Sequence, residues 1–443
     1  MSTKSYNTLR NDFPHFSYRG FEIVSGRDSD AVQYSFGIEG LQDFSSTYRF
    51  PRGRSGASLE ELTPFVARLG LIEALSYWKL TCSPNFHLHA LGIAHEELPF
   101  WQHLFYNGLS EFRYRNNITT CEDDFVQFHG SSETPSDLTT LPELTGNLIP
   151  IGGGKDSIVT LEALSNLKEE NTVFLLNPRP ACTRSAEIAG YHKAQILEVS
   201  RSLDPQLLKL NSEGFLNGHT PFSALLAFTT LVGAALNGNR YIVLSNEGSA
   251  SEGNIAGEEV NHQYSKSIDF ESRFRAYVRS FLSHDLEYFS FLRPLHEVQI
   301  ARFFAMHEQY FPIFRSCNVG CYEDRWCERC PKCLFTALIL APFTSLDSIF
   351  EHNPLENLDL QDLLLDLCLP DRVKPFECVG TREESTACAQ QLLSHNNPPK
   401  LLAELRERLS SHIQLERLLS DWNSEHFLPP SFEHILQERI TNI

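Results

Sequence analysis

The sequence predicts an α/β protein in which a doubly wound parallel sheet follows an N-terminal α+β domain and precedes a helical C-terminal region. Two patterns carry this prediction. Short apolar runs alternate with helical periodicity in the middle of the chain, and Leu-rich amphipathic segments, Leu358–Leu369 and Lys400–Leu419, occupy its end. A chain of 443 residues that is 42% hydrophobic is long enough for two or three domains. We place the domain boundaries at residues 1–143, 144–341 and 342–443.

Charge and hydropathy limit the class of partner. The net charge of −19 argues against a protein that holds nucleic acid mainly by neutralising phosphates. No apolar signal segment follows Met1–Phe13, and the most apolar stretch, Pro221–Leu236, is shorter than the roughly 20 residues of a membrane span. We therefore expect a cytoplasmic protein with no membrane or nucleic-acid partner, in which Pro221–Leu236 is a buried core helix.

The first part of the chain combines strands and helices. Short alternating runs over Tyr18–Phe50 are typical of antiparallel strands. Apolar residues then recur every three to four positions over Leu59–Trp78, which predicts a helix, and an aromatic second helix is expected over Pro99–Phe112. The polar stretch Ser131–Gly146 is typical of a linker, so we expect the α+β domain to end there.

Strands and helices alternate after the linker, as in a parallel sheet with crossover helices. The segments are Asn147–Ile151, Asp156–Lys168, Thr172–Leu176, Ser185–Ala189, Gln195–Val199, Phe222–Asn237 and Tyr241–Ser245. Ligands of such sheets bind beyond the carboxyl ends of the strands. The loops that begin at Gly152, Asn177 and Asn246 are therefore the expected binding edge.

A glycine-rich turn joins the strand Asn147–Ile151 to the next helix. Its glycines allow backbone N–H groups to approach a polyphosphate, and the helix N-terminus adds partial positive charge. Ser157 supplies a further donor, whereas Asp156 would be repelled by phosphates and is expected to hold Mg²⁺ or to fix the loop. The Walker A spacing is absent. The alternative is a glycine turn that binds nothing.

Two polar segments follow the strand that ends at Ser245. The first carries two carboxylates, Glu247 and Glu252, which suit metal binding, substrate binding or proton transfer. The second, Asn261–Ser267, is rich in donors for an anion or a sugar. The alternative for the first segment is a solvated surface loop.

Cysteines cluster near the end of the central region. Cys327, Cys330 and Cys333 are separated by two residues each, which suits thiolates that converge on one zinc ion, and Cys317 or Cys321 would complete a set of four. Two alternatives stay open. The cysteines could be ordinary buried thiols, or one could be a reactive acid or base.

The glycine turn Gly152–Ser157 resembles the PP-loop of the ATP pyrophosphatase superfamily, with Gly152 in place of the usual first serine. More narrowly, several motifs together resemble the UDP-N-acetyl-α-D-muramoyl-L-alanyl-L-glutamate epimerase family of bacteria. These motifs are Ile151–Ser157, Ser245–Asn254, Gln263–Ser267, Ser316–Asn318, Trp326–Cys333 and Lys374–Thr381. The superfamily resemblance implies an adenine nucleotide α-hydrolase-like domain.

The family resemblance also implies a reaction. Members use ATP and Mg²⁺ to invert the terminal L-Glu of UDP-MurNAc-L-Ala-L-Glu, releasing AMP and pyrophosphate, to make the D-Glu of peptidoglycan and so maintain the cell wall and cell shape. An acyl-adenylate makes physical sense here. It removes the carboxylate charge that would oppose a carbanion at the neighbouring carbon, so that a base can take the proton and an oxyanion site can hold the enolate.

The motifs and the resemblance together lead to hypotheses about individual residues. ATP would be held by Gly152, Gly153, Gly154, Lys155, Asp156, Ser157 and Asn246, with Asp156 on Mg²⁺. Lys155 or Lys266 would neutralise charge during adenylation. The candidates for proton transfer are Glu247, Glu252, His262, Cys330 and Cys333. A structural zinc ion would be held by Cys317, Cys327, Cys330 and Cys333.

Two other functions remain alternatives. A PP-loop enzyme could adenylate a nucleobase or tRNA, as cyano-deazaguanine synthase and thiolating relatives do, although the net charge of −19 argues against tRNA. A non-catalytic nucleotide sensor or assembly scaffold would bind ATP without turnover, but intact Asp156 and Ser157 argue against it. The sequence leaves the oligomeric state open.

Overall fold

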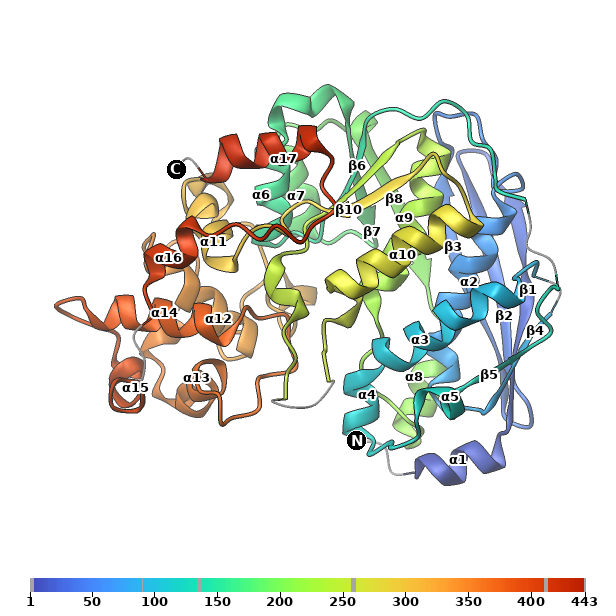
Figure 1. Ribbon diagram of the computed structural model, residues 1–443, viewed down its shortest axis with the longest axis horizontal. Helices are drawn as coiled ribbons and strands as arrows, with labels where there is room; N and C mark the ends of the chain where they lie inside the picture. Colours follow the sequence, from blue (N-terminus) through green and yellow to red (C-terminus); the bar gives the residue numbers. More distant parts are fainter. Residues whose placement is uncertain (1–3, 90, 134–136, 256–259, 410–412, 442–443) are drawn as a thin grey trace. The chain divides into compact units, whose positions relative to one another are not determined.

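The computed structural model describes residues 4–89, 91–133, 137–255, 260–409 and 413–441. The chain divides into two compact units (Figure 1). Within the described residues, unit 1 draws on the ranges 1–148, 197–242 and 260–288, and unit 2 on the ranges 149–196, 243–259 and 289–443. Each unit therefore collects segments that lie far apart in the sequence. The predicted division near residues 143 and 341 stays a prediction.

Unit 1 contains a mixed sheet with the strand order β8-β3-β2-β1-β4-β5. The strands are β1 His15–Ser25, β2 Ser29–Ile38, β3 Gln42–Pro51, β4 Asn85–Leu88, β5 Gln127–His129 and β8 Ile196–Ser202. Strands β1, β2 and β3 pair antiparallel, which confirms the strands expected over Tyr18–Phe50. Strand β4 pairs parallel with both β1 and β5.

Strand β8 corrects the expectation of a purely parallel sheet. The sequence pattern places it in the parallel region, but it pairs antiparallel with β3 through residues such as Arg201, opposite Tyr48. The alternation of strands and helices predicts that a strand exists, but not which edge it joins. That choice depends on the β3 backbone, which comes from a distant part of the chain.

The helices of unit 1 bury the apolar stripes seen in the sequence. They are α1 Tyr6–Asp12, α2 Thr63–Trp78, α3 Leu98–Gly108, α4 Ser110–Arg115, α5 Glu122–Phe125, α8 Gln206–Ser212, α9 Phe222–Asn237 and α10 Ile268–Phe281. Helix α2 packs on strands β1 and β2 and against α9. The buried helix expected over Pro221–Leu236 is confirmed as α9. The single helix expected over Pro99–Phe112 is instead two, α3 and α4, which meet at Leu109.

A buried ion pair ties the helices of unit 1 together. Arg68 on α2 donates from Nε to Glu97 Oε2 over 3.0 Å, and its guanidinium also contacts the second oxygen of Glu97. The Tyr277 hydroxyl, from α10, donates to the same carboxylate. The Arg68 and Glu97 side chains are each 1% exposed. Each charge is stabilised by the other, because water cannot reach either group to solvate it.

The central region of the chain has the strand-then-helix order predicted from its sequence. Strands β10 Glu287–Ser290, β9 Tyr241–Leu244, β6 Asn147–Pro150 and β7 Asn171–Leu176 are neighbours in that order, and β6 pairs parallel with β9. The boundary between the units falls within β6, β9 and β10. The loops after β6, β7 and β9 begin as expected, next to Gly152, Asn177 and Asn246.

The helical C-terminal region is confirmed. The helices of unit 2 are α6 Lys155–Ala163, α7 Pro180–Ile188, α11 Glu297–Ala305, α12 Pro331–Leu340, α13 Gln361–Cys368, α14 Arg382–Leu393, α15 Ala403–Arg408, α16 Leu415–Ser420 and α17 Pro430–Leu436. In the described part of the segment Lys400–Leu419, the α-helices are α15 and α16, so the segment is not one continuous helix. The aromatic side chains of Phe314 and Phe350 flank Trp326, with ring centroids 5.1 and 4.9 Å from it.

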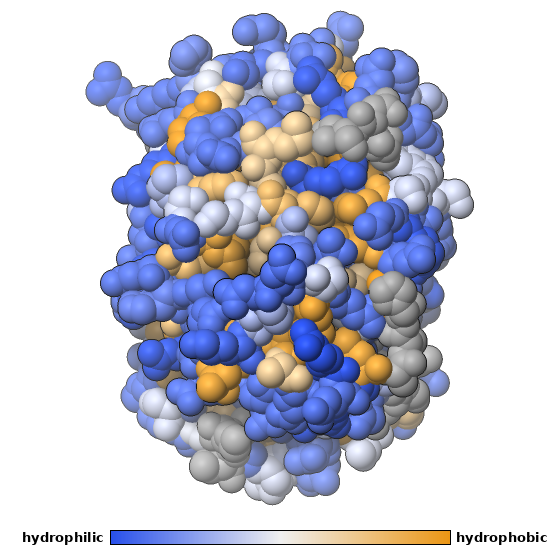
Figure 2. Space-filling view, turned by 90° about the vertical axis from the view of Figure 1, so that its left-hand side faces the viewer, coloured by the Kyte–Doolittle hydropathy of each residue, from blue (hydrophilic) through white to orange (hydrophobic). Residues whose placement is uncertain are grey.

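The surface is predominantly polar on the face drawn in Figure 2, where small hydrophobic patches are interrupted by hydrophilic side chains. Within the described part of the chain, no helix combines the length and the apolar character that crossing a bilayer would require. This agrees with the expectation that Pro221–Leu236 packs in a protein core.

Replacing Glu97 with Ala tests the buried ion pair. The substitution leaves the Arg68 guanidinium buried without its carboxylate, so the free energy of unfolding should fall by about 3–5 kcal/mol. Urea unfolding measures this change. The exposed pair Arg19–Asp43, with side chains 47% and 67% exposed, is the matched control. Asp43→Ala should cost about 1 kcal/mol or less, and equal losses for the two variants would contradict the argument.

Candidate functional site

The glycine turn is built as the sequence predicts: strand β6 ends at Pro150, and helix α6 begins at Lys155. Gly153 has φ +76°, and a Cβ there would lie 2.9 Å from Ala181, so a larger residue would be strained. A Cβ at Gly152 would meet no described atom within 4 Å. There is therefore open space beside Gly152, where the backbone of the turn is expected to contact a ligand.

The first residue of α6 points into the protein. The Lys155 ammonium contacts the carboxylates of Asp156 and Glu297, and Lys155 is only 4% exposed. Burial opposes its charge, but the two carboxylates outweigh burial and raise its pKa. Ser157 is also turned inward, since its hydroxyl donates to the Gly154 carbonyl over 2.9 Å. Of the three glycines of the turn, Gly152 is the exposed one.

Three carboxylates meet beside Lys155. One oxygen from each of Asp156, Glu247 and Glu297 lies within 4.8 Å of the others. Burial raises the pKa of Glu297 well above its ordinary range, against the pull of Lys155, and Asp156 and Glu247 raise it further. Glu247 Oε1 accepts from the Ser249 hydroxyl over 3.3 Å. Among the described residues, Glu247 Oε2 is buried and has no hydrogen-bond partner.

These carboxylates fit a hard divalent cation. Mg²⁺ takes oxygen ligands and is usually bound by one or two carboxylates together with phosphate oxygens. A buried carboxylate oxygen without a donor is costly unless a cation or proton satisfies it. Asp156 and Glu247 were expected from the sequence. Glu297 was missed, because it lies far along the chain from the other two residues. The local signal there is the start of a helix, where the backbone N–H of His296 donates to Gln299 Oε1 over 2.8 Å.

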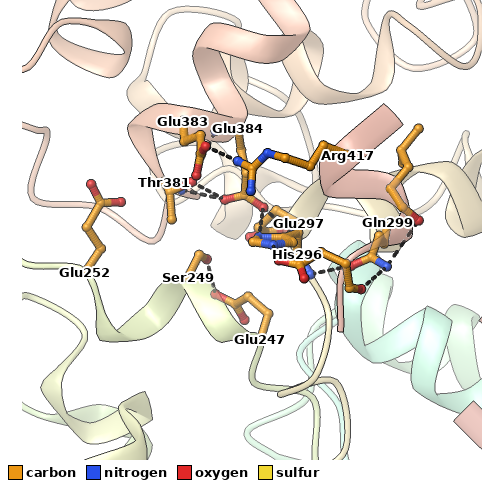
Figure 3. Close-up of polar contacts among 12 residues, drawn as sticks. Glu247, Ser249, Glu252, His296, Glu297, Gln299, Thr381, Glu383, Glu384 and Arg417 are labelled. Atoms are coloured by element: carbon orange, nitrogen blue, oxygen red, sulfur yellow. Dashed lines mark hydrogen bonds and ion pairs between the residues drawn. The ribbon is translucent and has the colours of Figure 1, made fainter. Parts of the chain in front are cut away.

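A second buried glutamate positions Glu297 (Figure 3). Glu384 Oε1 accepts the backbone N–H of Glu297, the first residue of α11. Glu384 Oε2 accepts from the backbone N–H and the hydroxyl of Thr381, over 2.6 and 2.8 Å, and so caps α14. His296 Nε2 lies 3.0 Å from Asp421 Oδ2. One carboxylate therefore caps two helices and holds Glu297 at the carboxylate cluster.

The second predicted carboxylate lies elsewhere in unit 2. Glu252 Oε2 lies 3.0 Å from Lys374 Nζ, and the Lys374 side chain is 2% exposed. The Asn254 amide donates to the Pro375 carbonyl over 2.8 Å. Asn246 donates to the Ser290 hydroxyl over 3.1 Å. Figure 3 shows Glu252 separate from Glu247, so the loop places one carboxylate in the cluster and anchors the other to the Lys374 segment.

The cysteines converge in unit 2. One Sγ from each of Cys317, Cys327, Cys330 and Cys333 lies within 4.8 Å of the others. The pairs Cys317–Cys330, Cys327–Cys333 and Cys330–Cys333 are 3.9, 3.7 and 3.5 Å apart. Cys321, the alternative fourth ligand, donates instead to the Asn318 carbonyl over 3.0 Å. Four sulfurs around zinc at about 2.3 Å lie about 3.8 Å apart, so this set fits the ion.

The remaining predicted residues lie in unit 1. His262 contacts Glu111, and His219 Nδ1 lies 3.8 Å from the same carboxylate. Burial, and then the neighbouring His262, lower the pKa of His219 to about 3. Lys266 ends the short 3₁₀ helix η5 (Tyr264–Lys266) and is half-buried. Glu111 was missed in the sequence, since a glutamate within an amphipathic helix carries no distinctive signal.

Comparisons with known proteins give a consistent result. The chain matches the profile of the MurL N-terminal domain over residues 7–291 and that of the MurL C-terminal domain over residues 313–417. A protein of Xanthomonas oryzae pv. oryzae, named UDP-N-acetyl-alpha-D-muramoyl-L-alanyl-L-glutamate epimerase, is 34% identical over 86% of this chain and 87% of its own length. A Micromonospora protein of the same name is 33% identical over 85% and 86%. No solved structure matches the chain.

Replacing Lys155 with Met tests the electrostatics of the carboxylate cluster. The variant keeps the length of the side chain but leaves three carboxylates without a cation, so the free energy of unfolding should fall by about 3–5 kcal/mol. Mg²⁺ should restore part of this loss and should raise the unfolding midpoint more than in the unaltered protein. Urea unfolding with and without Mg²⁺ measures both effects.

The control for this experiment is Lys209→Met. Lys209 is an exposed lysine, 4.0 Å from Glu213, and its side chain is 65% exposed. Its loss should change stability by less than about 1 kcal/mol, with no altered response to Mg²⁺. If the Lys155 variant responds to Mg²⁺ no more than the Lys209 variant does, the cluster is not a cation site.

Proposed function

The chain belongs to the MurL family, and we propose that it inverts the terminal L-Glu of UDP-MurNAc-L-Ala-L-Glu to D-Glu in peptidoglycan precursor synthesis. The names of the relatives support the substrate and the epimerisation. The observation that carries the ATP-dependent part is the glycine turn at the N-terminus of α6, next to the cluster of Asp156, Glu247 and Glu297. Nucleotide activation and proton transfer would then act in sequence on one substrate.

ATP would bind with its phosphates at the glycine turn. The backbone N–H groups at the start of α6 and the partial positive charge of the helix favour phosphate oxygens there. Asp156, Glu247 and Glu297 would hold Mg²⁺, which supplies charge neutralisation to the phosphates. Attack of a glutamyl carboxylate of the substrate on the α-phosphate forms an acyl-adenylate and releases pyrophosphate, and later hydrolysis of that adenylate releases AMP.

Adenylation explains why an epimerase would consume ATP. A carbanion next to an ionised carboxylate is strongly disfavoured, because two negative charges would share neighbouring atoms. The acyl-adenylate has lost that carboxylate charge and stabilises the enolate that forms when a base takes the α-proton. Return of a proton on the opposite face inverts the carbon, which requires an acid and a base on two sides.

Among the candidates for proton transfer, the residues that would bind metal ions fit least well. Cys330 and Cys333 lie within the four-sulfur cluster, and Glu247 lies within the carboxylate cluster that would hold Mg²⁺. A side chain that coordinates a metal ion cannot at the same time exchange protons with a substrate. Glu252 stays a candidate, and so does His262 when no metal ion is bound to it.

We also propose that the four cysteines hold a structural zinc ion. The backbone N–H of Gly320 donates to Cys317 Sγ over 3.1 Å, and that of Cys327 lies 3.4 Å from the same sulfur, as is typical of thiolate ligands. Trp326 packs between two phenylalanines beside the cluster. The ion would stabilise the loop that leads into α12.

The proposed reaction can be tested in D₂O with UDP-MurNAc-L-Ala-L-Glu, ATP and Mg²⁺. We expect AMP, deuterium at the glutamyl α-carbon and D-Glu after hydrolysis of the product. Asp156→Asn should lower the rate of AMP formation on the order of 100-fold or more, because it removes a charge beside the reacting phosphates. Asp347→Asn, at an exposed aspartate of unit 2, is the control.

The possible results separate the steps of the mechanism. AMP without deuterium would show that the substrate is activated but not deprotonated. Absence of AMP would refute the proposal and would direct attention to nucleobase or tRNA substrates. Near-normal AMP formation by the Asp156 variant would remove Asp156 from the mechanism.

Zinc analysis of freshly purified protein tests the cysteine cluster. The protein should contain one tightly held zinc ion, and Cys330→Ser should lower the zinc content and the thermal stability together, because metal binding is coupled to folding of the site. Cys121→Ser, at an exposed cysteine outside the cluster, should change neither quantity. Protein that is fully stable yet free of zinc would defeat this proposal.

A further inference from the structure

A second cluster of metal-ligating side chains lies in unit 1. One ligand atom from each of Glu111, His219 and His262 lies within 4.8 Å of the others. Glu111 is on α4, His219 is in the loop before α9, and His262 is in the loop before η5. The three side chains are 7%, 19% and 13% exposed. Two imidazoles therefore converge on one buried carboxylate.

Both oxygens of that carboxylate are already oriented. Arg115 Nε, one turn further along the helix, donates to Glu111 Oε1. Oε2 faces both histidines: it contacts His262 Nδ1 and lies 3.8 Å from His219 Nδ1. The two imidazole rings have centroids 4.3 Å apart. A simple ion pair needs one histidine, whereas a metal site needs donors that meet at a common point.

The loops that carry the histidines are held by other buried groups. The Ser110 hydroxyl donates to the Asn261 carbonyl over 2.8 Å and accepts from the Asn261 backbone N–H over 3.2 Å, directly before His262. The Lys79 ammonium donates to the Gly218 carbonyl over 2.6 Å and also contacts the Thr220 hydroxyl, on either side of His219. Preorganised donors lose little conformational freedom when an ion binds.

We propose that Glu111, His219 and His262 form a binding site for a divalent transition-metal ion, with zinc the ion that the donors fit best. Two imidazole nitrogens and one carboxylate oxygen are the ligand set of many open zinc sites, which keep at least one position for an oxygen ligand. Ions at metal–ligand distances of about 2.0–2.2 Å need donors roughly 3–4 Å apart, close to the 3.8 Å seen between His219 and Glu111. His262 Nδ1 is in direct contact with Glu111 Oε2, so these two atoms would separate when the ion binds.

A cavity lies beside two residues that adjoin the cluster. It has a volume of about 800 Å³ and is lined by Arg115, which holds Glu111, and by Gly218, which precedes His219. Its other walls are mostly polar, with amide and hydroxyl side chains such as Asn217 and Thr119. The proposal concerns a different ion site from the carboxylate cluster and the cysteines, and it does not depend on the proposed epimerisation.

Equilibrium dialysis of the full-length protein against zinc, with excess Mg²⁺ to occupy oxygen-ligand sites, tests this proposal. We expect two bound zinc ions in the unaltered protein and one after the double substitution Cys330→Ser and Cys333→Ser. The double substitution His219→Asn and His262→Asn should remove the other ion. His103→Asn is the control, because His103 contacts the carboxylates of Glu122 and Asp269 without a second histidine.

Glu111→Gln provides a second variant in case the histidine variant does not fold. It keeps the shape of the side chain and removes the charge, and it should weaken zinc binding at this site at least about 10-fold. Cobalt bound to the cysteine-substituted protein should absorb in the visible range without a thiolate-to-metal band. Unchanged zinc stoichiometry and affinity in both the histidine and the glutamine variants would overturn the proposal, whether or not the protein epimerises its substrate.

Discussion

The Glu384 carboxylate is the contact on which the candidate site depends. It caps α14 through Thr381 and α11 through the backbone N–H of Glu297, and the N-terminal ends of both helices would otherwise carry unsatisfied donors. Glu297 in turn contacts Lys155 at the start of α6. Three helix N-termini are therefore joined by two buried glutamates and one lysine. The favourable field of those helix ends is what allows carboxylates to be buried there.

This arrangement explains the concentration of charge in unit 2. Burying ionised groups is costly, and a stable fold would gain as much from apolar side chains of similar volume. Asp156, Glu247 and Glu297 are nevertheless gathered around one lysine, and Glu247 retains an oxygen without a donor among the described residues. This is what the proposed function requires: the cluster would be half of a binding site whose other half arrives with the ligand.

The sequence predicted the parts of the site that are local. Residues 152–157 and the cysteine spacing each specify their geometry within a few neighbouring positions, as a turn with positive φ at Gly153 and as converging sulfurs. Glu297, Glu384 and Glu111 could not be predicted, because each acts through a partner more than a hundred residues away or through a helix end formed elsewhere. The same reason explains β8, whose antiparallel pairing with β3 depends on a distant edge.

The position of Lys155 bears on how the family could use ATP. A lysine next to a glycine turn would ordinarily be assigned to phosphate, yet here its ammonium is committed to Asp156 and Glu297. When all three carboxylates are ionised, they and the ammonium together carry a formal charge of −2. A triphosphate that approaches the turn would therefore meet net repulsion. A divalent cation at the carboxylates would cancel that charge. If ATP binds at the turn as proposed, charge neutralisation of the nucleotide would fall to the metal ion and the helix N-terminus, and the lysine would serve to assemble the ligands that hold the ion.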